Sequence, residues 1–568
     1  MTNLVEAAQA WMAEDPDASM RDIVSAWIDA EDEESLQRAF GQRLQFGTAG
    51  LRGILGPGPA HMNRALVCRV SMGLGRYVLD RVDGAAERGI VVGADARHMS
   101  AEFLEDTLAV LSSLGLRVYH FPFPVATPIV AHAVTRLNAA AGVVITASHN
   151  PPEYNGYKAY WENGAQIIPP HDDGISEAID LVESIAGVAV DSKRLVALGD
   201  EMLDLYFEAI EGLRRRPQLE PRIRVCYTPL HGVGGRFVQR ALSAGAGAVA
   251  HLSVVEEQFE PDGDFPTVRF PNPEEAGALD LAIQTARDND ASLILANDPD
   301  VDRLAAAVRQ EDGEYRVLNG NEIGALLGDY LLSEDGENAS TALVMTTIVS
   351  SRLLSLLAKH YGAAYGETLT GFKWIANASR EHEAKHGSHF LFGYEEALGY
   401  TVGMVTPDKD GISAAVLLAE LASVCAEAGK SLLDRLEDIH RCHGLHVSHL
   451  HTLTLPGAAG ARRIRQLMEN LRSDPPTEVD GLRVVKSVDY APGVDGLEPS
   501  NVLAFDLEDG GQILARPSGT EPKIKFYFEL RIEMRDDERE ADARLRVGPL
   551  MDSLVQAFVD RAVPSAAE

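Results

Sequence analysis

The stretch LILANDPDVDR, Leu293–Arg303, places four apolar residues directly before a polar loop. A short, continuous apolar run of this kind is typical of a parallel strand that is covered on both faces. In α/β sheets, ligands bind beyond the carboxyl ends of the strands. The stretch therefore predicts a buried strand that leads into a ligand-binding loop.

The same order of elements occurs three times along the chain. In each copy an apolar run enters a polar or glycine-containing turn, a helix-like segment follows, and a second apolar run ends in a polar loop. The copies begin with IVVGADAR (Ile90–Arg97), IRVCYTPLHGVGG (Ile223–Gly235) and ALVMTTIVSSR (Ala342–Arg352), and they end with VVITASHN (Val143–Asn150), LILANDPDVDR and FLFGYEEALGY (Phe390–Tyr400). Their spacing differs, so the chain repeats a topology rather than a sequence. The alternation predicts three α/β domains in succession.

The two ends of the chain follow other patterns. The first 45 residues carry an apolar stripe at helical spacing, with acidic residues on the other face. From about residue 446, runs such as HLHTLTL and KIKFYFELRIEM indicate an antiparallel sheet with one solvated face, and the final stretch is helical. A chain of 568 residues corresponds to about three to five domains. We therefore expect four, at residues 1–205, 206–322, 323–445 and 446–568, the last of them a smaller α+β domain.

The composition argues against several classes of protein. The chain has 51 Lys and Arg against 85 Asp and Glu, a formal net charge of −34, and it lacks the basic run typical of a nucleic-acid-binding face. Four scattered cysteines without a CxxC pair indicate reduced thiols. The acidic N-terminus does not have the pattern of a secretory signal, and the most apolar stretch, Ile412–Gly429, is interrupted by Glu420 and Glu427. We expect a cytoplasmic protein without a nucleic-acid or membrane partner.

Three aspartates alternate in the loop that follows the first quoted strand: Asp298, Asp300 and Asp302. Side chains at alternate positions of an extended segment lie on one face, where three carboxylates repel one another. A divalent cation removes that repulsion, and a set of oxygen ligands favours Mg²⁺ over Zn²⁺. A solvated acidic loop is the alternative, but the apolar runs on both sides and the rigid Pro299 disfavour it. The sequence predicts a magnesium site here.

The loop TASHNPPEYNGYKAY, Thr146–Tyr160, offers a candidate nucleophile, Ser148, with His149 beside it and Lys158 ten residues further on. Two prolines and a glycine prevent a helix from including the serine, so its hydroxyl can project from the loop. A free serine is a weak nucleophile and needs an activating base or a phosphoryl group that is already attached. An ordinary turn with a solvated serine is the alternative.

Two further polar loops are candidates for binding. Glu395 and Glu396 lie between apolar residues and glycines, where they could accept hydrogen bonds from sugar hydroxyls or contact a cation; acids in the first turn of a helix are the alternative. The segment Ala515–Tyr527 joins two strands and offers a cradle for an anion, although a plain β-turn fits it as well. The residues of that cradle are Arg516, Ser518, Gly519, Thr520 and Lys523.

One motif points to a different chemistry. HEAKH, His382–His386, satisfies the H-E-x-x-H pattern of zinc peptidases. Its flanks are polar, whereas a metalloprotease helix must also bury one face, and Gly387 ends the segment at once. We interpret it as a solvated helix end and keep a zinc peptidase as a remote alternative.

Six motifs occur together in the chain: FGTAGLRG, TASHNPPEYNGYKAY, NDPDVDR, TLTGFKW, GYEEALGY and RPSGTEPK, between residues 46 and 523. In this set and order they resemble the α-D-phosphohexomutase family, most closely its phosphoglucomutase and phosphopentomutase-like branch. The resemblance covers all four expected domains. It implies three α/β domains with mixed sheets and a smaller α+β domain around a deep central cleft.

The resemblance also implies roles for individual residues. Ser148 would carry an exchangeable phosphoryl group, and Asp298, Asp300 and Asp302 would bind Mg²⁺ together with it, with Arg303 beside the metal. Arg516, Ser518, Gly519, Thr520 and Lys523 would hold the non-reacting phosphate, and Glu395 with Glu396 would face the sugar hydroxyls. The residues around the transferring phosphate would be Arg52, His149, Lys158, Lys373 and Lys409, with Lys158 or a close neighbour assisting proton transfer.

The implied reaction is that of an isomerase, an intramolecular phosphotransferase. Phosphoserine would donate its phosphoryl group to a phosphosugar, and the bisphosphorylated intermediate would return its other phosphate, so a sugar bisphosphate would serve as activator. Many phosphoglucomutases carry Glu-Glu-Ser in the sugar loop, whereas this chain has Ala397 after its two glutamates. We expect glucose 1-phosphate and 6-phosphate as substrates, with mannose or pentose phosphates as alternatives. A non-catalytic sugar-phosphate sensor is a remote alternative, which the combination of Ser148 and the three aspartates disfavours.

Overall fold

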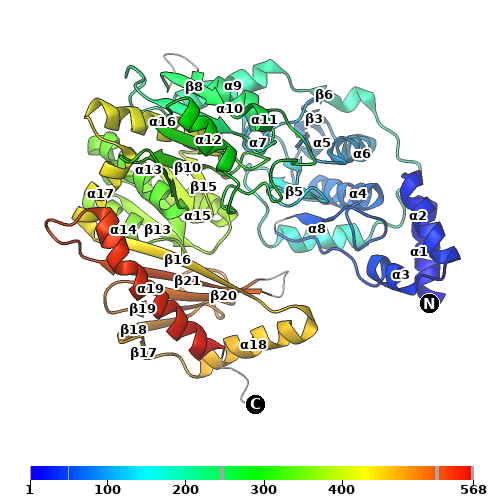
Figure 1. Ribbon diagram of the computed structural model, residues 1–568. Helices are drawn as coiled ribbons and strands as arrows, with labels where there is room; N and C mark the ends of the chain where they lie inside the picture. Colours follow the sequence, from blue (N-terminus) through cyan, green and yellow to red (C-terminus); the bar gives the residue numbers. More distant parts are fainter. Residues whose placement is uncertain (1, 49, 244–248, 519–522, 564–568) are drawn as a thin grey trace.

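The strands of the chain form four sheets that follow one another along the sequence (Figure 1). This count refers to the residues that the computed structural model describes, 2–48, 50–243, 249–518 and 523–563. Each sheet and its helices make one domain, and these are called domains I to IV. The division at residues 205, 322 and 445 is kept as a proposal; the first two boundaries fall inside α9 (Asp200–Glu211) and α13 (Gly320–Asp335), and the third falls after the first residue of β16 (Leu445–Thr454).

Three short helices precede domain I, as the apolar stripe predicted: α1 (Thr2–Glu14), α2 (Ala18–Asp29) and α3 (Glu33–Phe40). The carboxylates of Asp17 and Asp32 accept N–H groups at the starts of α2 and α3, which satisfies donors that have no partner inside a helix. The helices pack on one another through a small apolar cluster around Val24. An ion pair between Glu14 and Arg69 ties them to domain I.

Domain I contains a mixed sheet in the order β1-β5-β4-β2-β3-β6, in which only β5 runs against both of its neighbours. Ile90 and Val92 of β2 belong to one apolar cluster and Val91 to another, so the central strand is covered on both faces. The strands are β1 (Leu51–Ile54), β2 (Ile90–Ala94), β3 (Val118–His120), β4 (Ala141–Ile145), β5 (Tyr154–Trp161) and β6 (Leu195–Ala197), and the helices include α4 (Arg64–Arg81), α6 (Ser100–Ser113), α7 (Thr127–Arg136) and α8 (His171–Asp180).

Domains II and III repeat this plan with smaller sheets, in the orders β11-β10-β9-β7-β8 and β13-β12-β14-β15. Domain II has β7 (Arg224–Thr228), β8 (His251–Val254), β9 (Leu293–Ala296), β10 (Ala305–Arg309) and β11 (Tyr315–Leu318), with α9, α10 (Gly234–Ser243) and α12 (Asp280–Asp288). Domain III has β12 (Ala342–Thr347), β13 (Ala364–Thr368), β14 (His389–Glu395) and β15 (Gly399–Val402), with α13, α14 (Leu353–Tyr361), α15 (Phe372–His386), α16 (Gly411–Glu427) and α17 (Leu432–His443).

Domain IV has an antiparallel sheet in the order β16-β21-β20-β19-β18-β17, as the sequence predicted. Its strands are β16, β17 (Glu478–Val479), β18 (Leu482–Asp489), β19 (Leu503–Leu507), β20 (Gln512–Pro517) and β21 (Lys523–Ile532), and its helices are α18 (Gly457–Ser473) and α19 (Glu540–Ala562). One face of β21, with Phe526 and Phe528, packs under the helices. The other face, with Tyr527, rests on Ile348 and Leu369 of domain III.

The three α/β domains share a feature that places their polar loops. In each one a parallel strand is followed directly by a strand that returns antiparallel to it: β4 by β5, β9 by β10 and β14 by β15. The connecting loop therefore lies at the carboxyl end of the parallel strand, where ligands bind in α/β sheets. These three loops are the ones that hold Ser148, the three aspartates and the two glutamates.

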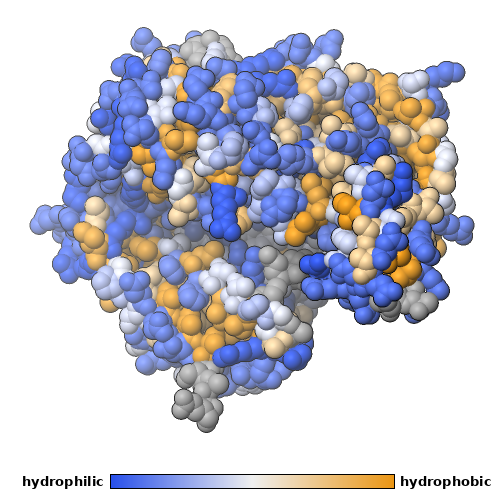
Figure 2. Space-filling model, turned by 45° about the vertical axis from the view of Figure 1, so that its right-hand side comes forward, coloured by the Kyte–Doolittle hydropathy of each residue, from blue (hydrophilic) through white to orange (hydrophobic). Residues whose placement is uncertain are grey.

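One apolar cluster spans domains I, II and III and includes Val130, Val225 and Leu326, while domain I has a second cluster of its own. Domain IV has a core of its own around Phe526 and Phe558. The predicted apolar helix is α16, and most of its residues are buried. In the described part of the chain, no single helix has the length and composition of a membrane span, although the bent pair of α16 and α17 does so jointly. The surface is hollowed between domain IV and the domains above it (Figure 2).

Candidate active site

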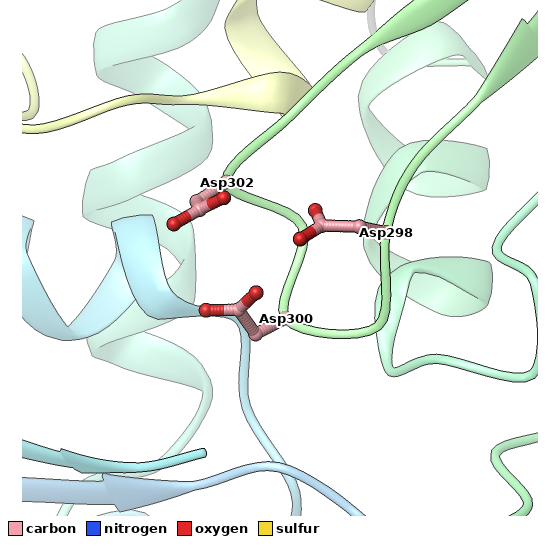
Figure 3. A group of neighbouring side chains, drawn as sticks. All are labelled: Asp298, Asp300 and Asp302. Carbon is pink, nitrogen blue, oxygen red and sulfur yellow. The ribbon is translucent and has the colours of Figure 1, made fainter. Parts of the chain in front are cut away.

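The three aspartates of the β9–β10 loop lie together in the interior. Asp298, Asp300 and Asp302 are all buried, and each offers an oxygen within 4.8 Å of the other two (Figure 3). Among the described residues this is the one group of three or more acidic, histidine or cysteine side chains that could hold a metal ion. Asp300 Oδ1 and Asp302 Oδ1 are buried and lack hydrogen-bond partners in the described structure. Buried carboxylate oxygens without donors fit a hard divalent cation such as Mg²⁺.

The backbone of this loop is fixed from several directions. Asn297, buried at the end of β9, receives a hydrogen bond from the hydroxyl of Tyr227 at 2.9 Å and donates to the carbonyl of Arg303 at 2.5 Å. Thr127 at the start of α7 in domain I donates its hydroxyl to Asp300 Oδ2 at 2.5 Å, and its N–H bonds the carbonyl of Asp300 at 3.0 Å. The aspartates are therefore held by domain I as well as by their own domain.

Two lysines compensate the charge of the aspartates. Lys158 Nζ lies 2.6 Å from Asp300 Oδ2 and 2.9 Å from Asp302 Oδ2, and Lys409 Nζ lies 3.3 Å from Asp302. Burial and the two neighbouring carboxylates raise the pKa of Asp298 well above its usual range. Burial also acts to raise the pKa of Asp302, but the charges of Lys158 and Lys409 outweigh it and hold that pKa low. Lys158 belongs to strand β5, whereas the sequence suggested a loop position.

Ser148 lies at the carboxyl end of β4, beside this cluster. Its Oγ donates to Asp298 Oδ2 at 2.8 Å and lies 3.1 Å from Nδ1 of His149. The residue has a φ of 54°, in the left-handed region that few non-glycine residues adopt. Burial and the charges of Arg303 and Arg52 lower the pKa of His149 well below 6.5, so the imidazole is neutral at pH 7. The serine hydroxyl therefore has two proton acceptors within reach.

Arg52, expected around the transferring phosphate, and Arg303, expected beside the metal, both lie near enough to His149 of the serine loop to lower its pKa. Arg52 of β1 donates to the side chain of Asn150 at 3.0 Å. Arg303 follows the aspartates and forms an ion pair with Glu274 at 3.3 Å. Glu274 was not among the residues identified from the sequence; it comes from a loop of domain II that precedes α12.

The two glutamates of the β14–β15 turn do not lie in the first turn of a helix, which was the alternative to a binding role. Glu395 Oε1 accepts the N–H of Gly371 at 2.6 Å, which joins this turn to the segment that carries Lys373. Glu396 accepts hydrogen bonds from the hydroxyls of Thr347 and Ser350 at 3.3 and 3.2 Å. Burial lowers the pKa of Lys373 to about 8.

Lys409 reaches the aspartates because one residue of β15 has no side chain. A Cβ at Gly399 would lie 2.3 Å from Cδ of Lys409. The absence of a side chain at Gly399 therefore leaves room for the Lys409 side chain to extend toward the aspartates. The carboxylate of Asp408 lies 3.3 Å from the Lys409 ammonium as well. Burial acts to lower the pKa of the lysine, but the charges of Asp302 and Asp408 outweigh it and leave that pKa raised.

In domain IV, the expected anion cradle spans the end of β20 and the start of β21. Arg516 lies in β20, Lys523 begins β21, and the N–H of Ser518 bonds the carbonyl of Lys523 at 2.8 Å. Gly519 and Thr520 lie outside the described residues. Lys525, which the sequence argument did not include, pairs directly with Arg516 across the two strands, so both side chains lie on one face. Burial lowers the pKa of this lysine.

A separate cavity of about 490 Å³ lies between domains II, III and IV. Leu318 of domain II, Val349 of domain III and Phe528 of domain IV are part of its wall. It touches the sugar loop at Glu396, but none of the three aspartates lines it. The cavity therefore lies beside the site and not within it.

The HEAKH segment forms the end of α15, and the helix stops at Gly387 as expected. The carboxylate of Glu383 accepts the backbone N–H of Phe390 at 2.8 Å, and Nδ1 of His382 lies 2.7 Å from the hydroxyl of Ser388. These groups have structural partners, and they do not belong to the one group of three or more possible metal ligands among the described residues. The geometry does not support a zinc peptidase.

A buried serine bonded to one of three clustered aspartates, with lysines and arginines around it, defines an enzyme of phosphoryl transfer. Models of the four domains of phosphoglucomutase/phosphomannomutase, namely alpha/beta/alpha domains I, II and III and the C-terminal domain, match residues 43–185, 204–313, 319–442 and 464–546. The chain belongs to this family, which confirms the family prediction made from the six motifs.

Relatives of the chain carry three different names. It is 38% identical over 562 residues to a phosphopentomutase of Pongo abelii, with 92% of this chain and 91% of that protein covered. It is 40% identical over 489 residues to a probable phosphomannomutase of Haemophilus influenzae, with 85% and 95% covered. It is 35% identical over 534 residues to a phosphoglucomutase of Staphylococcus haemolyticus, with 90% and 94% covered.

Family and structure together confirm several of the sequence predictions. The fold has three α/β/α domains with mixed sheets and an antiparallel C-terminal domain. The protein is an isomerase, an intramolecular phosphotransferase of the phosphohexomutase type that acts on a phosphosugar. Its buried aspartates match the magnesium site that is typical of the family.

Proposed function

We propose that the chain is a phosphosugar mutase that works through a phosphoserine at Ser148 and a bisphosphorylated sugar. The observation that carries this proposal is the position of the Ser148 hydroxyl, 2.8 Å from Asp298 within a buried cluster of three aspartates and two lysines. A serine held this way can carry a phosphoryl group whose charge is neutralised by its surroundings.

The reaction has two transfers. In the first, the P–O bond at Ser148 Oγ breaks, a P–O bond to a free sugar hydroxyl forms, and the proton of that hydroxyl ends on Ser148 Oγ. In the second, Ser148 Oγ attacks the other phosphate of the bisphosphorylated sugar, and the P–O bond to the sugar oxygen breaks. The serine proton ends on that sugar oxygen, the phosphoserine is restored and the isomer is released. Mg²⁺, when bound by Asp298, Asp300, Asp302 and the phosphoserine, supplies positive charge at the transferring group. A sugar bisphosphate primes enzyme that lacks the phosphoryl group.

The protein side chains divide the remaining tasks. The neutral imidazole of His149, 3.1 Å from Ser148 Oγ, accepts the serine proton in the second transfer. Lys158, with Arg303 and Arg52, neutralises the transferring phosphoryl group and orients its oxygens. At the other end of the substrate, Arg516, Ser518 and Lys523 hold the second phosphate, together with Gly519 and Thr520 from outside the described residues. Lys373, Lys409, Glu395 and Glu396 surround the sugar.

For the sugar, we place a pentose 1-phosphate first. The relative named phosphopentomutase aligns with 92% of the chain at 38% identity, and the turn after Glu396 carries Ala397 instead of a residue with a hydroxyl. Glucose 1-phosphate, favoured from the sequence alone, is the second candidate, because a phosphoglucomutase aligns with 90% of the chain. Mannose 1-phosphate is the third, supported by the probable phosphomannomutase.

A panel of ribose, glucose and mannose 1-phosphates tests this proposal, assayed with Mg²⁺ and a trace of the matching sugar bisphosphate. We expect the highest kcat/KM for the pentose. Ser148→Ala should lose nearly all turnover and the phosphoryl mass on the intact protein, whereas Ser340→Ala, whose hydroxyl only bonds the carbonyl of Glu337 on the surface, should keep both. Substantial isomerisation by Ser148→Ala would overturn the phosphoserine mechanism, and a clear preference for a hexose would overturn the choice of sugar.

A further inference from the structure

A buried guanidinium lies directly beneath the serine loop. Arg97 follows strand β2, and its side chain is almost completely inaccessible to solvent. Its Nη2 donates to the carbonyls of Ser148 and Asn150, both at 2.5 Å, and its Nη1 donates to those of Pro151 and Tyr154 at 2.9 and 3.3 Å. One side chain thus bonds four carbonyls of the loop that carries the nucleophile.

The serine loop needs such a donor because its own backbone supplies few. Pro151 and Pro152 have no N–H group, and Ser148 in its left-handed conformation interrupts any regular pattern. Buried carbonyls without a donor destabilise a structure. A guanidinium presents several N–H groups in one plane, whereas an ammonium is a compact charge that cannot reach four acceptors in a row.

Arg97 is itself held in place from two domains. The carboxylate of Asp95 lies 3.3 Å from its Nε and also accepts hydrogen bonds from the Arg97 N–H and from the hydroxyl of Ser100. On the other side, the buried ring of Phe265 from domain II lies 4.9 Å from the guanidinium carbon. The guanidinium therefore has a single orientation, fixed by a carboxylate of domain I and an aromatic ring of domain II.

We propose that Arg97 is a positioning residue for the phosphoryl-carrying serine. By binding the carbonyls of Ser148, Asn150, Pro151 and Tyr154, it holds Ser148 in its left-handed conformation and directs Oγ at Asp298. Its Nη groups donate to these carbonyls and its side chain is almost completely buried, so it acts on the rate of transfer and not on the affinity for substrate. The inference rests on the proposed role of Ser148.

Arg97→Ala tests the proposal, because it removes the planar donor and leaves space for a free guanidinium ion. We expect kcat to fall about 10²-fold, the effect of a small misplacement of a reacting atom, with KM almost unchanged. Guanidinium chloride at low millimolar concentration, well below denaturing levels, should restore a large part of kcat, and ethylammonium chloride at equal ionic strength should not. Arg97→Lys should show a loss in kcat of the same kind.

Arg214→Ala is the matched control. This arginine is equally buried and donates to Glu420 at 2.8 Å, between α9 and α16 and away from the serine. The variant should lose stability but keep the kcat of its folded fraction, with no response to guanidinium. If Arg97→Ala behaves like it, with activity that follows the folded fraction alone, the positioning role is wrong.

Two further measurements distinguish a failure of this inference from a failure of the proposed function and from misfolding of the variant. The rate at which the bisphosphate of the preferred sugar loads a phosphoryl group onto the intact protein should fall in Arg97→Ala, while the wild-type chain still loads. A wild-type chain that loads from none of the ribose, glucose and mannose bisphosphates contradicts the phosphoserine mechanism instead. If Arg97→Ala does not fold, Phe265→Leu is the variant to be tested in its place. The inference is overturned if Phe265→Leu and Arg97→Lys both fold and both keep the wild-type kcat.

Discussion

The ammonium of Lys158 lies 2.6 Å from Oδ2 of Asp300, so a strand of domain I is paired with the aspartate loop of domain II. Both groups are buried, and Asp302 accepts a second hydrogen bond from the same lysine. Buried charges of one sign are tolerated only with partners of the other sign. Without a metal, Lys158 and Lys409 therefore supply positive charge to this cluster, with Lys158 in contact with two of its three carboxylates.

Replacement of Lys158 tests how far the stability of the aspartate cluster depends on its positive charge. Lys158→Met leaves the carboxylates of Asp300 and Asp302 with less compensation, and we expect the free energy of unfolding in EDTA to fall by about 3 kcal/mol or more. Saturating Mg²⁺ should recover much of the loss, because the cation replaces the missing charge. Urea unfolding with EDTA and with Mg²⁺ measures both effects. Lys430→Met, which removes a surface ion pair with Asp438, should change little under either condition; equal stability of the two variants in EDTA would contradict the argument.

Metal binding should stabilise the folded chain through the aspartates. A ligand present at 100 times its Kd stabilises the folded state by about 2.7 kcal/mol, so Mg²⁺ should raise the melting temperature of the wild-type chain. Asp300→Asn should abolish most of that shift and most of the turnover. Asp312→Asn, in the exposed turn between β10 and β11, should retain both. A shift of the same size in Asp300→Asn would place the cation elsewhere.

Lys373 gives a prediction for alkaline pH. Burial lowers the pKa of its ammonium to about 8, so the charge is present below that pH and is lost as the pH rises through it. The neutral amine binds a phosphate less well, and kcat/KM, which reports the free enzyme, should therefore fall above about pH 8.

Lys373→Arg should remove this inflection, because a guanidinium stays charged across the range. Lys359→Arg, on the exposed end of α14, is the control and should keep it. A profile of kcat/KM against pH from 6.5 to 9.5 decides the matter; the same inflection in all three proteins would assign it to another group.

Lys525 should contribute to binding of the phosphate held by domain IV. Its side chain lies on the same face of the sheet as that of Arg516 on the neighbouring strand, and burial lowers its pKa. A bound phosphate would stabilise the charged form of this buried lysine. Lys525→Met should raise KM about tenfold, or roughly 1.4 kcal/mol, with a smaller change in kcat. Lys486→Met, exposed on β18 of the same domain, should leave KM unaltered, and an unaltered KM in Lys525→Met as well would exclude the contact.

Short-range patterns were enough to predict the aspartate cluster and the serine loop. The alternation of Asp298, Asp300 and Asp302 after a buried strand is visible in the sequence, and so is the break that the prolines impose after Ser148. Lys158 was placed in the same loop as Ser148, but Tyr154–Trp161 form a strand that pairs with β1 through Tyr154–Tyr157 and with β4 through Tyr157–Trp161. Pairing with a neighbouring strand outweighed the local turn signal.

Other contributors depend on how distant segments meet. Arg97 and Thr127 reach the site only because the carboxyl end of β2 and the start of α7 adjoin loops far away in the sequence. Lys525 could have been predicted from the sequence, because residues two apart on a strand share a face and Lys523 was already a candidate. Its pairing with Arg516 in register, however, became apparent only from the sheet.

The separate core of domain IV has a consequence for how the protein becomes active during its synthesis. Domains I to III share one apolar cluster and can fold together, whereas domain IV forms around its own residues and is made after them. Domains emerging from the ribosome generally fold in order. Ser148 and the aspartates are thus assembled on a nascent chain that still lacks Arg516 and Lys523. If Arg516 and Lys523 hold the second phosphate as proposed, such a chain lacks one end of the site, and we expect catalysis to begin only once the fourth domain has been made and has folded.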